Sequence, residues 1–117
     1  MESEFKVYMY EILKIQAPFG RTSSDGCLGG DTIRKLMEDN WNTHEKISVF
    51  FDGIVKMTRP FVDEAFARLL ETHTLEEFNK KVHFPDANDS TVKALNDAFK
   101  LRLKTIRAQK EREDLNA

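Results

Sequence analysis

The sequence has one cysteine, three prolines and five glycines in 117 residues, and it has no long hydrophobic run. A single cysteine cannot form an internal disulfide, which favours a reducing compartment. A membrane-spanning helix needs about 20 mostly apolar residues, and no stretch approaches that length. The charged N-terminal residues are not typical of a secretory signal. We therefore expect a soluble, cytoplasmic protein that needs no membrane.

The chain also lacks an excess of charge of one sign. Eighteen basic residues stand against twenty acidic ones, and both kinds are interspersed along the sequence. Nucleic-acid-binding proteins usually present a basic excess or a basic face, because phosphate contacts supply much of their affinity. The composition therefore argues against a nucleic acid as the partner.

Metal-ligand spacing is missing as well. The three histidines, at positions 44, 73 and 83, form neither an HxH nor an HxxxH pair. None of them stands in a known catalytic spacing with Cys27, and a reactive thiol needs such a base or another positive field. We expect no metal, no cofactor and a structural role for the cysteine.

Hydrophobic periodicity predicts a single α/β domain with a small, mostly parallel or mixed sheet and flanking helices. The expected strands cover residues 5–15, 47–55 and 82–84. The expected helices cover residues 31–41, 59–71, 74–81 and 89–106. The domain is expected to span residues 1–108, and the charged residues 109–117 to form a frayed helix end or a disordered tail.

Several residues mark the element ends. Asp31 and Asp89 are expected to cap the helices that follow them, because an aspartate side chain can accept from free N–H groups of the first turn. Pro60 suits a first helical turn, and Thr74 and Glu77 have the capping-box spacing. The strand over 47–55 is almost continuously apolar, which indicates a central strand covered on both faces.

Four of the five glycines fall in the stretch GRTSSDGCLGGD, residues 20–31. Glycines allow close backbone approach, and N–H groups of such a loop at a helix N-terminus can hold an anion. The stretch matches neither GxGxxG nor the P-loop pattern, and Asp25 and Asp31 would repel an anion. A tight structural connection and a contact site for a ligand or partner both stay open.

Asp63 and Glu64 lie near the start of the helix that includes Pro60. Acidic residues there complement the positive end of the helix dipole. A pair of catalytic carboxylates would need a cleft and raised pKa values, and nothing in the sequence indicates either. We favour the electrostatic interpretation.

Three segments together resemble a bacterial family, the STAS-like domains, which are related to sulfate-transporter and anti-sigma-factor-antagonist domains. The loop GRTSSDG followed by GGDTIRKLM resembles the family's Arg-x-Ser-Asp-Gly loop and helix. ISVFFDGIV resembles its central strand, and FVDEAFARLL resembles its next helix, with Phe61, Glu64 and Phe66 at matching positions. ANDSTVKALNDAF is a weaker fourth match, so the resemblance spans about residues 19–103.

The resemblance implies a regulatory function without catalysis. Related antagonists dock on a protein partner, often a histidine-kinase-like ATPase, and are phosphorylated on a serine at the start of the helix after the central strand. In this chain Arg59-Pro60 replaces the expected serines, and the nearest hydroxyl is Thr58, one position early. This departure argues against a phosphate-dependent switch of that kind, and Arg59 would favour an acidic partner.

These observations predict a non-catalytic protein-protein interaction module of STAS-like fold. Its expected contact surface joins the glycine-rich loop to the start of the following helix, through Arg21, Ser24, Asp25, Gly26, Thr58, Arg59, Asp63 and Glu64. The alternative is a sensor that binds a small ligand or a nucleotide with loop 20–31. An enzyme using Asp25, Cys27 or Glu64 is a third hypothesis, and the sequence leaves open whether an exposed apolar helix face makes a homodimer.

Overall fold

The computed structural model describes residues 3–24 and 27–116 of the chain. Strands and helices alternate along these residues, as expected for an α/β protein. Their bounds are β1 Glu4–Tyr8, α1 Met9–Leu13, α2 Gly30–Asp39, β2 Lys46–Phe50, α3 Arg59–Ala65, the 3-10 helix η1 Ala67–Glu71, α4 Leu75–Lys81, β3 Val82–His83 and α5 Asp89–Asn116.

Within the described residues the sheet has three strands in the order β1-β2-β3, and both pairs are parallel. The predicted fold class and the central position of β2 are confirmed. Val7 of β1 is in register with Val49 of β2, and both are fully buried. On the opposite face Ser48 donates to the Glu4 carboxylate, and the rings of Tyr8 and Phe50 stack. That face of β2 is therefore covered by side chains of its neighbouring strand.

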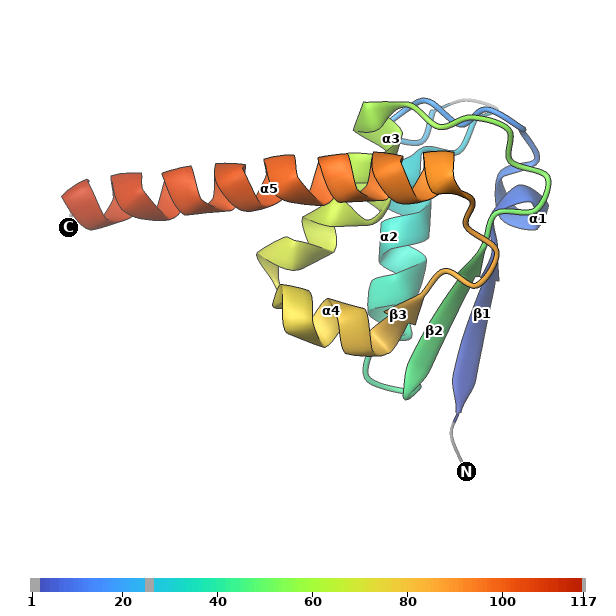
Figure 1. The fold of residues 1–117 in the computed structure, drawn as a ribbon, viewed down its shortest axis with the longest axis horizontal. Helices are drawn as coiled ribbons and strands as arrows, with labels where there is room; N and C mark the ends of the chain where they lie inside the picture. The colour runs from blue at the N-terminus through green and yellow to red at the C-terminus, as the bar shows by residue number, and fades with distance from the viewer. Residues whose placement is uncertain (1–2, 25–26, 117) are drawn as a thin grey trace.

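The helices α2, α4 and α5 lie to one side of β1 and β2 (Figure 1). Large apolar side chains from every layer meet between them, and three phenylalanines, Phe61, Phe66 and Phe78, are almost fully buried. Burial of a large apolar side chain stabilises the fold by about 1.5–3 kcal/mol. In this core α3 packs against both α2 and α5, and η1 packs against α5.

All three expected strands are shorter in the structure, β3 only by its last residue, since it ends at His83. The predicted strand 5–15 is wrong beyond Tyr8, because residues 9–13 form α1, which buries Met9 and Leu13 on one face. Met9 and Leu13 fit helical spacing as well as alternation, so the sequence pattern was ambiguous there. The strand expected over 47–55 ends at Phe50, where the Asp86 carboxylate accepts hydrogen bonds from the N–H groups of Phe51 and Asp52.

The expected caps are partly right. Thr74 and Glu77 form the predicted capping box of α4, and Pro60 lies in the first turn of α3. Asp31 is not a cap, since α2 begins one residue earlier and its N-cap is Gly29. The first turn of α5 is capped by Asn88, whose Oδ1 accepts from Thr91 N at 2.8 Å, and not by Asp89.

Two helical segments differ in length from expectation. The helix expected over 59–71 is divided at Phe66 into α3 and η1. Helix α5 continues through most of the charged segment that was expected to fray or to be disordered, and its C-terminal half extends beyond the body of the protein (Figure 1). In the part of the chain that the structure describes, no helix combines the length and hydrophobicity of a membrane span.

Candidate functional site

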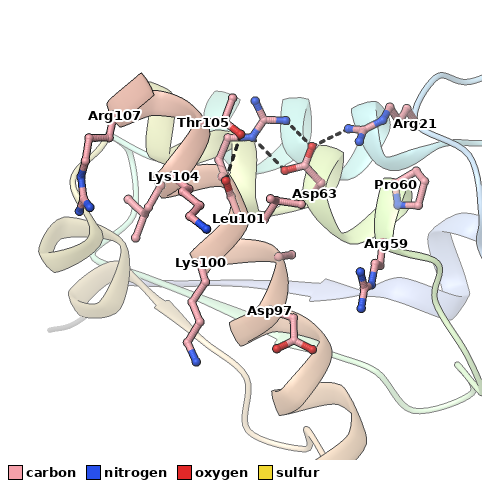
Figure 2. Close-up of a pocket in the computed structure, with 13 residues that line it drawn as sticks. Arg21, Arg59, Pro60, Asp63, Asp97, Lys100, Leu101, Lys104, Thr105 and Arg107 are labelled. Carbon is pink, nitrogen blue, oxygen red and sulfur yellow. Dashed lines mark hydrogen bonds and ion pairs between the residues drawn. The ribbon is translucent and has the colours of Figure 1, made fainter. Parts of the chain in front are cut away.

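The glycine-rich loop and the start of α3 lie side by side, as the sequence predicted. Nη1 of Arg21, in the loop, lies 2.6 Å from Oδ2 of Asp63 on α3 (Figure 2). The same nitrogen lies 3.7 Å from Oε1 of Glu64. Three of the predicted contact residues therefore meet in one cluster, although they are more than forty positions apart.

Asp63 also binds α5. Nε of Arg102 donates to Oδ1 of Asp63 at 2.9 Å, and Nη2 of the same guanidinium contacts Oδ2. Burial by itself would raise the pKa of Asp63, but the hydrogen bonds and positive charges of Arg102 and Arg21 outweigh it, so the pKa lies below its ordinary value. The hydrogen bond to Asp63 in turn raises the pKa of Arg102. At neutral pH Asp63 is therefore an ionised link between the loop and α5.

Glu64 is a buried carboxylate held by arginines. Its side chain is 8% exposed, and Oε2 accepts from Arg34 Nη2 at 2.9 Å and from Arg68 Nη1 at 3.0 Å. Arg34 comes from α2 and Arg68 from η1. A buried charge requires such partners, because desolvation of an unpaired carboxylate is costly. Each oxygen of Glu64 is occupied within the chain, which is the arrangement of a structural ion pair and not of a free general acid.

The ion pairs continue to Glu71 at the end of η1. Arg68 Nε donates to Glu71 Oε1 at 2.9 Å, and this bond raises the pKa of Arg68. Arg102 Nη1 lies 3.7 Å from Glu71 Oε2. Four arginines and three acids thus join the loop, α2, α3, η1 and α5 in one network. We call it the arginine-carboxylate network; its members are Arg21, Arg34, Arg68, Arg102, Asp63, Glu64 and Glu71.

Gly30 explains why the loop and α2 can sit so close to α3. A Cβ at this position would lie 2.7 Å from the Phe61 carbonyl oxygen and 2.9 Å from the Ala65 nitrogen. Backbone atoms cannot give way as a flexible side chain can. Only glycine therefore allows the first turn of α2 to pack directly on α3.

The N–H groups at the start of α2 are bonded within the loop. Gly30 N donates to Gly20 O and Asp31 N donates to Arg21 O, each at 2.9 Å, and Gly29 N donates to Ser23 Oγ at 3.0 Å. A helix N-terminus holds an anion through such N–H groups when they are free. The geometry here favours the tight structural connection over an anion-binding loop.

The side chain of Asp31 also holds the same loop in place, through hydrogen bonds. Its carboxylate accepts from the N–H and the hydroxyl of Ser23, at 3.0 Å and 2.8 Å to Oδ1. Burial tends to raise the pKa of Asp31, but the hydrogen bonds from Ser23 and from the Thr32 backbone, together with the charge of Arg34, outweigh it, so the pKa lies below its ordinary value. Beyond this, Ser24 and Cys27 exchange two backbone hydrogen bonds. Asp25 and Gly26, two of the predicted contact residues, lie outside the described residues.

Thr58 is the N-cap of α3. Its hydroxyl oxygen accepts from Phe61 N at 3.4 Å, and the same hydroxyl donates to Phe19 O at 2.7 Å. The side chain therefore starts α3 and also ties the segment before the glycine-rich loop to it. Both of its hydrogen-bonding functions are used in the folded protein.

Besides Arg21 and Ser24, the exposed residues of the predicted surface that the structure describes are Arg59 and Pro60. They line a groove of about 770 Å³ that runs between the start of α3 and α5. Figure 2 shows Arg59, Asp97, Lys100, Leu101 and Lys104 around it, with the Arg21–Asp63 pair at one end. The basic residues that line the groove are Arg21, Arg59, Lys100, Arg102, Lys104 and Arg107.

Only Asp63 and Asp97 supply negative charge to the lining of this groove, and Asp63 is neutralised by its two arginines. The groove is therefore cationic in a protein with a formal charge of −2. Among residues 3–24 and 27–116, no group of three or more His, Cys, Asp and Glu side chains is placed to hold a metal ion.

The sequence predicted three members of the network as site residues, namely Arg21, Asp63 and Glu64, and local spacing indicates a further contact. Glu64 and Arg68 have i,i+4 spacing, as do Arg34 and Glu38, and such spacing predicts contact on a helix. Sequence reasoning nevertheless missed Arg34, Arg68 and Arg102 as partners of the acids. For Arg34 and Arg102 no local signal exists, since they come from separate helices that only the packing brings to α3.

Comparison with family models matched residues 29–92 to a STAS-like domain of unknown function (DUF4325). The match runs from the N-cap of α2 to the first turn of α5 and includes Asp63, Glu64 and the start of α3. It confirms the resemblance indicated by the sequence motifs, while Arg21 lies before the matched range. Comparison with curated proteins and with solved structures found no match.

Proposed function

The chain belongs to the family of STAS-like domains of unknown function, and from this premise we propose that it regulates another protein by binding it, without catalysis of its own. The contact surface is the start of α3 together with the adjoining part of the cationic groove. The observation that carries the proposal is that Arg59 and Pro60 are exposed at the position where α3 begins, beside a groove with a basic lining.

The surface favours a partner with acidic side chains. Arg59, Lys100 and Lys104 present flexible cations around the groove, and the described residues include no ion pair for any of the three. Complementary charge speeds association and selects partners. Pro60 adds a rigid apolar surface next to Arg59. A partner loop or helix with carboxylates and a small apolar side chain fits this combination.

The carboxylates on α3 support a structural and not a catalytic role. A general acid or base needs a carboxyl group that can exchange a proton with a substrate. Asp63 and Glu64 are each held by at least two guanidinium groups. They place the arginines and fix α3, and the binding surface is formed by the residues that remain exposed.

A constitutive interaction suits this surface better than a phosphate-dependent one. Thr58, the hydroxyl nearest the position phosphorylated in related antagonists, donates to Phe19 O and caps α3. A phosphate ester on its oxygen has no hydrogen to donate to Phe19. We propose that Arg59 supplies a fixed charge there, and that the partner is an ATPase-fold regulatory protein like those on which related antagonists dock.

The test is recovery of the partner from cells with the tagged protein, followed by binding measurements with the purified pair. We expect Arg59→Glu to reduce the affinity of that pair at least tenfold. Lys80→Glu on α4 makes the same change of charge at an exposed site away from α3 and is expected to leave the affinity unchanged. Thermal unfolding of each variant shows that the fold is retained.

Equal affinity of the wild type and Arg59→Glu for every recovered protein would contradict the proposal. So would the recovery of a tightly bound small molecule in place of a protein, because that result favours a ligand sensor. Loss of binding in both variants would indicate a general dependence on net charge and would also count against this surface.

A further inference from the structure

The C-terminal part of α5 receives no support from the rest of the domain. Thr105 and Ile106 are the last half-buried residues, and residues 107–115 are all exposed. The described part of the chain offers no ion pair within this segment. A free helix of this length is marginal in water, because its backbone hydrogen bonds barely offset the entropy of ordering it. A second surface that covers this helix would account for its stability.

One face of the segment has a sparse apolar row. Leu101, Ala108 and Leu115 follow at intervals of seven residues, which places them within about 40° of one another around a helix. Leu101 is 60% exposed and Leu115 is 84% exposed. Thr105 lies between Leu101 and Ala108. Its hydroxyl donates to the Leu101 carbonyl, so it leaves no unpaired hydrogen-bond donor on this face. Exposed leucines at heptad spacing are the pattern of a helix that packs on another helix.

The two halves of the same segment differ in net charge. The half nearer the domain carries Lys100, Arg102, Lys104 and Arg107, which also line the cationic groove. The far half carries Lys110 and Arg112 together with Glu111, Glu113 and Asp114, which gives it a net charge of −1. A parallel pair of such helices would place the two basic halves together. An antiparallel pair places the far half of each helix, which carries these acids, on the basic half of the other.

We propose that the chain forms a homodimer in which the α5 helices of two copies pair antiparallel, with the two-fold axis near Ala108. Leu101 of each copy then packs on Leu115 of the other, since the two residues are equally far from Ala108 along the helix. The end of each helix that carries Glu111, Glu113 and Asp114 lies at the basic groove of the second copy. The occupant of this face of α5 is thus a second copy of the same chain.

The geometry specifies one ion pair on each side of the axis. Lys104 and Glu111 are nearly equidistant from Ala108 and lie on the same flank of the apolar row. In an antiparallel pair related by a two-fold axis, the same flanks of both helices face each other. Lys104 of one copy therefore meets Glu111 of the other, twice in the dimer.

The contact is small, because each helix contributes only two leucines and one alanine to its apolar centre. Interfaces of this size give weak, concentration-dependent dimers. The dimer contact includes Leu101 and Lys104, which also line the groove of the proposed function, but it is tested separately, by molecular mass in solution. A failure of the dimer would leave the binding test at Arg59 intact.

The experiment is sedimentation equilibrium of the full chain from low micromolar to near-millimolar concentration. We expect the wild type to move from monomer to dimer over this range, and Leu115→Glu to stay a monomer throughout. Lys104→Glu and Glu111→Lys should each weaken the dimer about tenfold or more, because each creates two like-charge contacts. The double variant carrying both changes should regain most of the wild-type affinity.

Lys110→Glu is the matched control, as it makes the same charge change on the opposite side of the helix and should leave the mass distribution unchanged. A wild type that stays monomeric at the highest concentration would overturn the proposal. A dimer that survives Leu115→Glu, or a double variant no stronger than the single ones, would overturn it as well.

Discussion

The guanidinium of Arg21 lies 2.6 Å from the carboxylate of Asp63, so the glycine-rich loop is fastened to α3 by an ion pair. Asp63 is held from its other side by Arg102 of α5. One carboxylate therefore joins three segments that are remote in the sequence. The loop that first suggested a ligand site is thus held to α3 by a structural ion pair. Arg59, which lines the same groove as Arg21, is exposed.

The two arginines on Asp63 are expected to differ in their effect on stability. The Arg21 side chain is 46% exposed, and such pairs contribute about 0.2–1 kcal/mol. The Arg102 side chain is 16% exposed and binds both oxygens of Asp63. We expect Arg102→Ala to lower the free energy of unfolding by about 1–3 kcal/mol, and Arg21→Ala by less, in urea denaturation. Equal losses in both variants would contradict this ranking.

Acid stability should depend on Asp63. Its pKa in the folded protein lies below the ordinary value of 3.8, which it regains on unfolding. The contribution of Asp63 is therefore fully present above that value and is lost as the pH falls through the folded pKa. We expect the wild type to lose stability more steeply than Asp63→Asn on acidification below about pH 4. Urea midpoints measured from neutral to acidic pH test this, and parallel curves would exclude it.

Gly30 and Gly20 provide a matched pair of substitutions. Alanine normally stabilises a helix relative to glycine, by about 1 kcal/mol, but at Gly30 its Cβ meets backbone atoms of α3 at 2.7 Å and 2.9 Å. We expect Gly30→Ala to lower the free energy of unfolding by about 1–3 kcal/mol. At Gly20 the nearest atom is 3.7 Å from the position that an alanine methyl group would take, so Gly20→Ala should change stability by less than about 0.5 kcal/mol. A stabilised Gly30→Ala would show that α2 does not pack on α3 this closely.

The hydroxyl of Thr58 is expected to act in folding. Thr58→Ala removes the cap of α3 and the hydrogen bond to Phe19 O, and should cost about 1 kcal/mol. Thr58→Ser keeps the hydroxyl and should retain most of the stability. Thermal unfolding of the two variants checks the prediction. If both lose the same amount, the methyl group and not the hydroxyl is what matters at this position.

Local sequence signals determined the fold class. The capping box at Thr74 and Glu77, the proline at the start of α3 and the apolar run of β2 each act over a few residues, and each is present in the structure. Where two local patterns fit equally well, the sequence failed, as at Met9 and Leu13. There the packing of two buried side chains on one face decided for a helix.

The candidate site also combines features that the sequence indicates with features that only the packing decides. The sequence by itself indicated that the loop and the start of α3 belong together, because the resemblance to the family includes both. Only the tertiary structure decided the partners of Asp63 and Glu64, since Arg34, Arg68 and Arg102 come from α2, η1 and α5. It also decided which of the predicted residues are exposed. Burial requires Asp63 and Glu64 to be neutralised, whereas Arg59, at the exposed end of α3, keeps its charge for solvent or a partner.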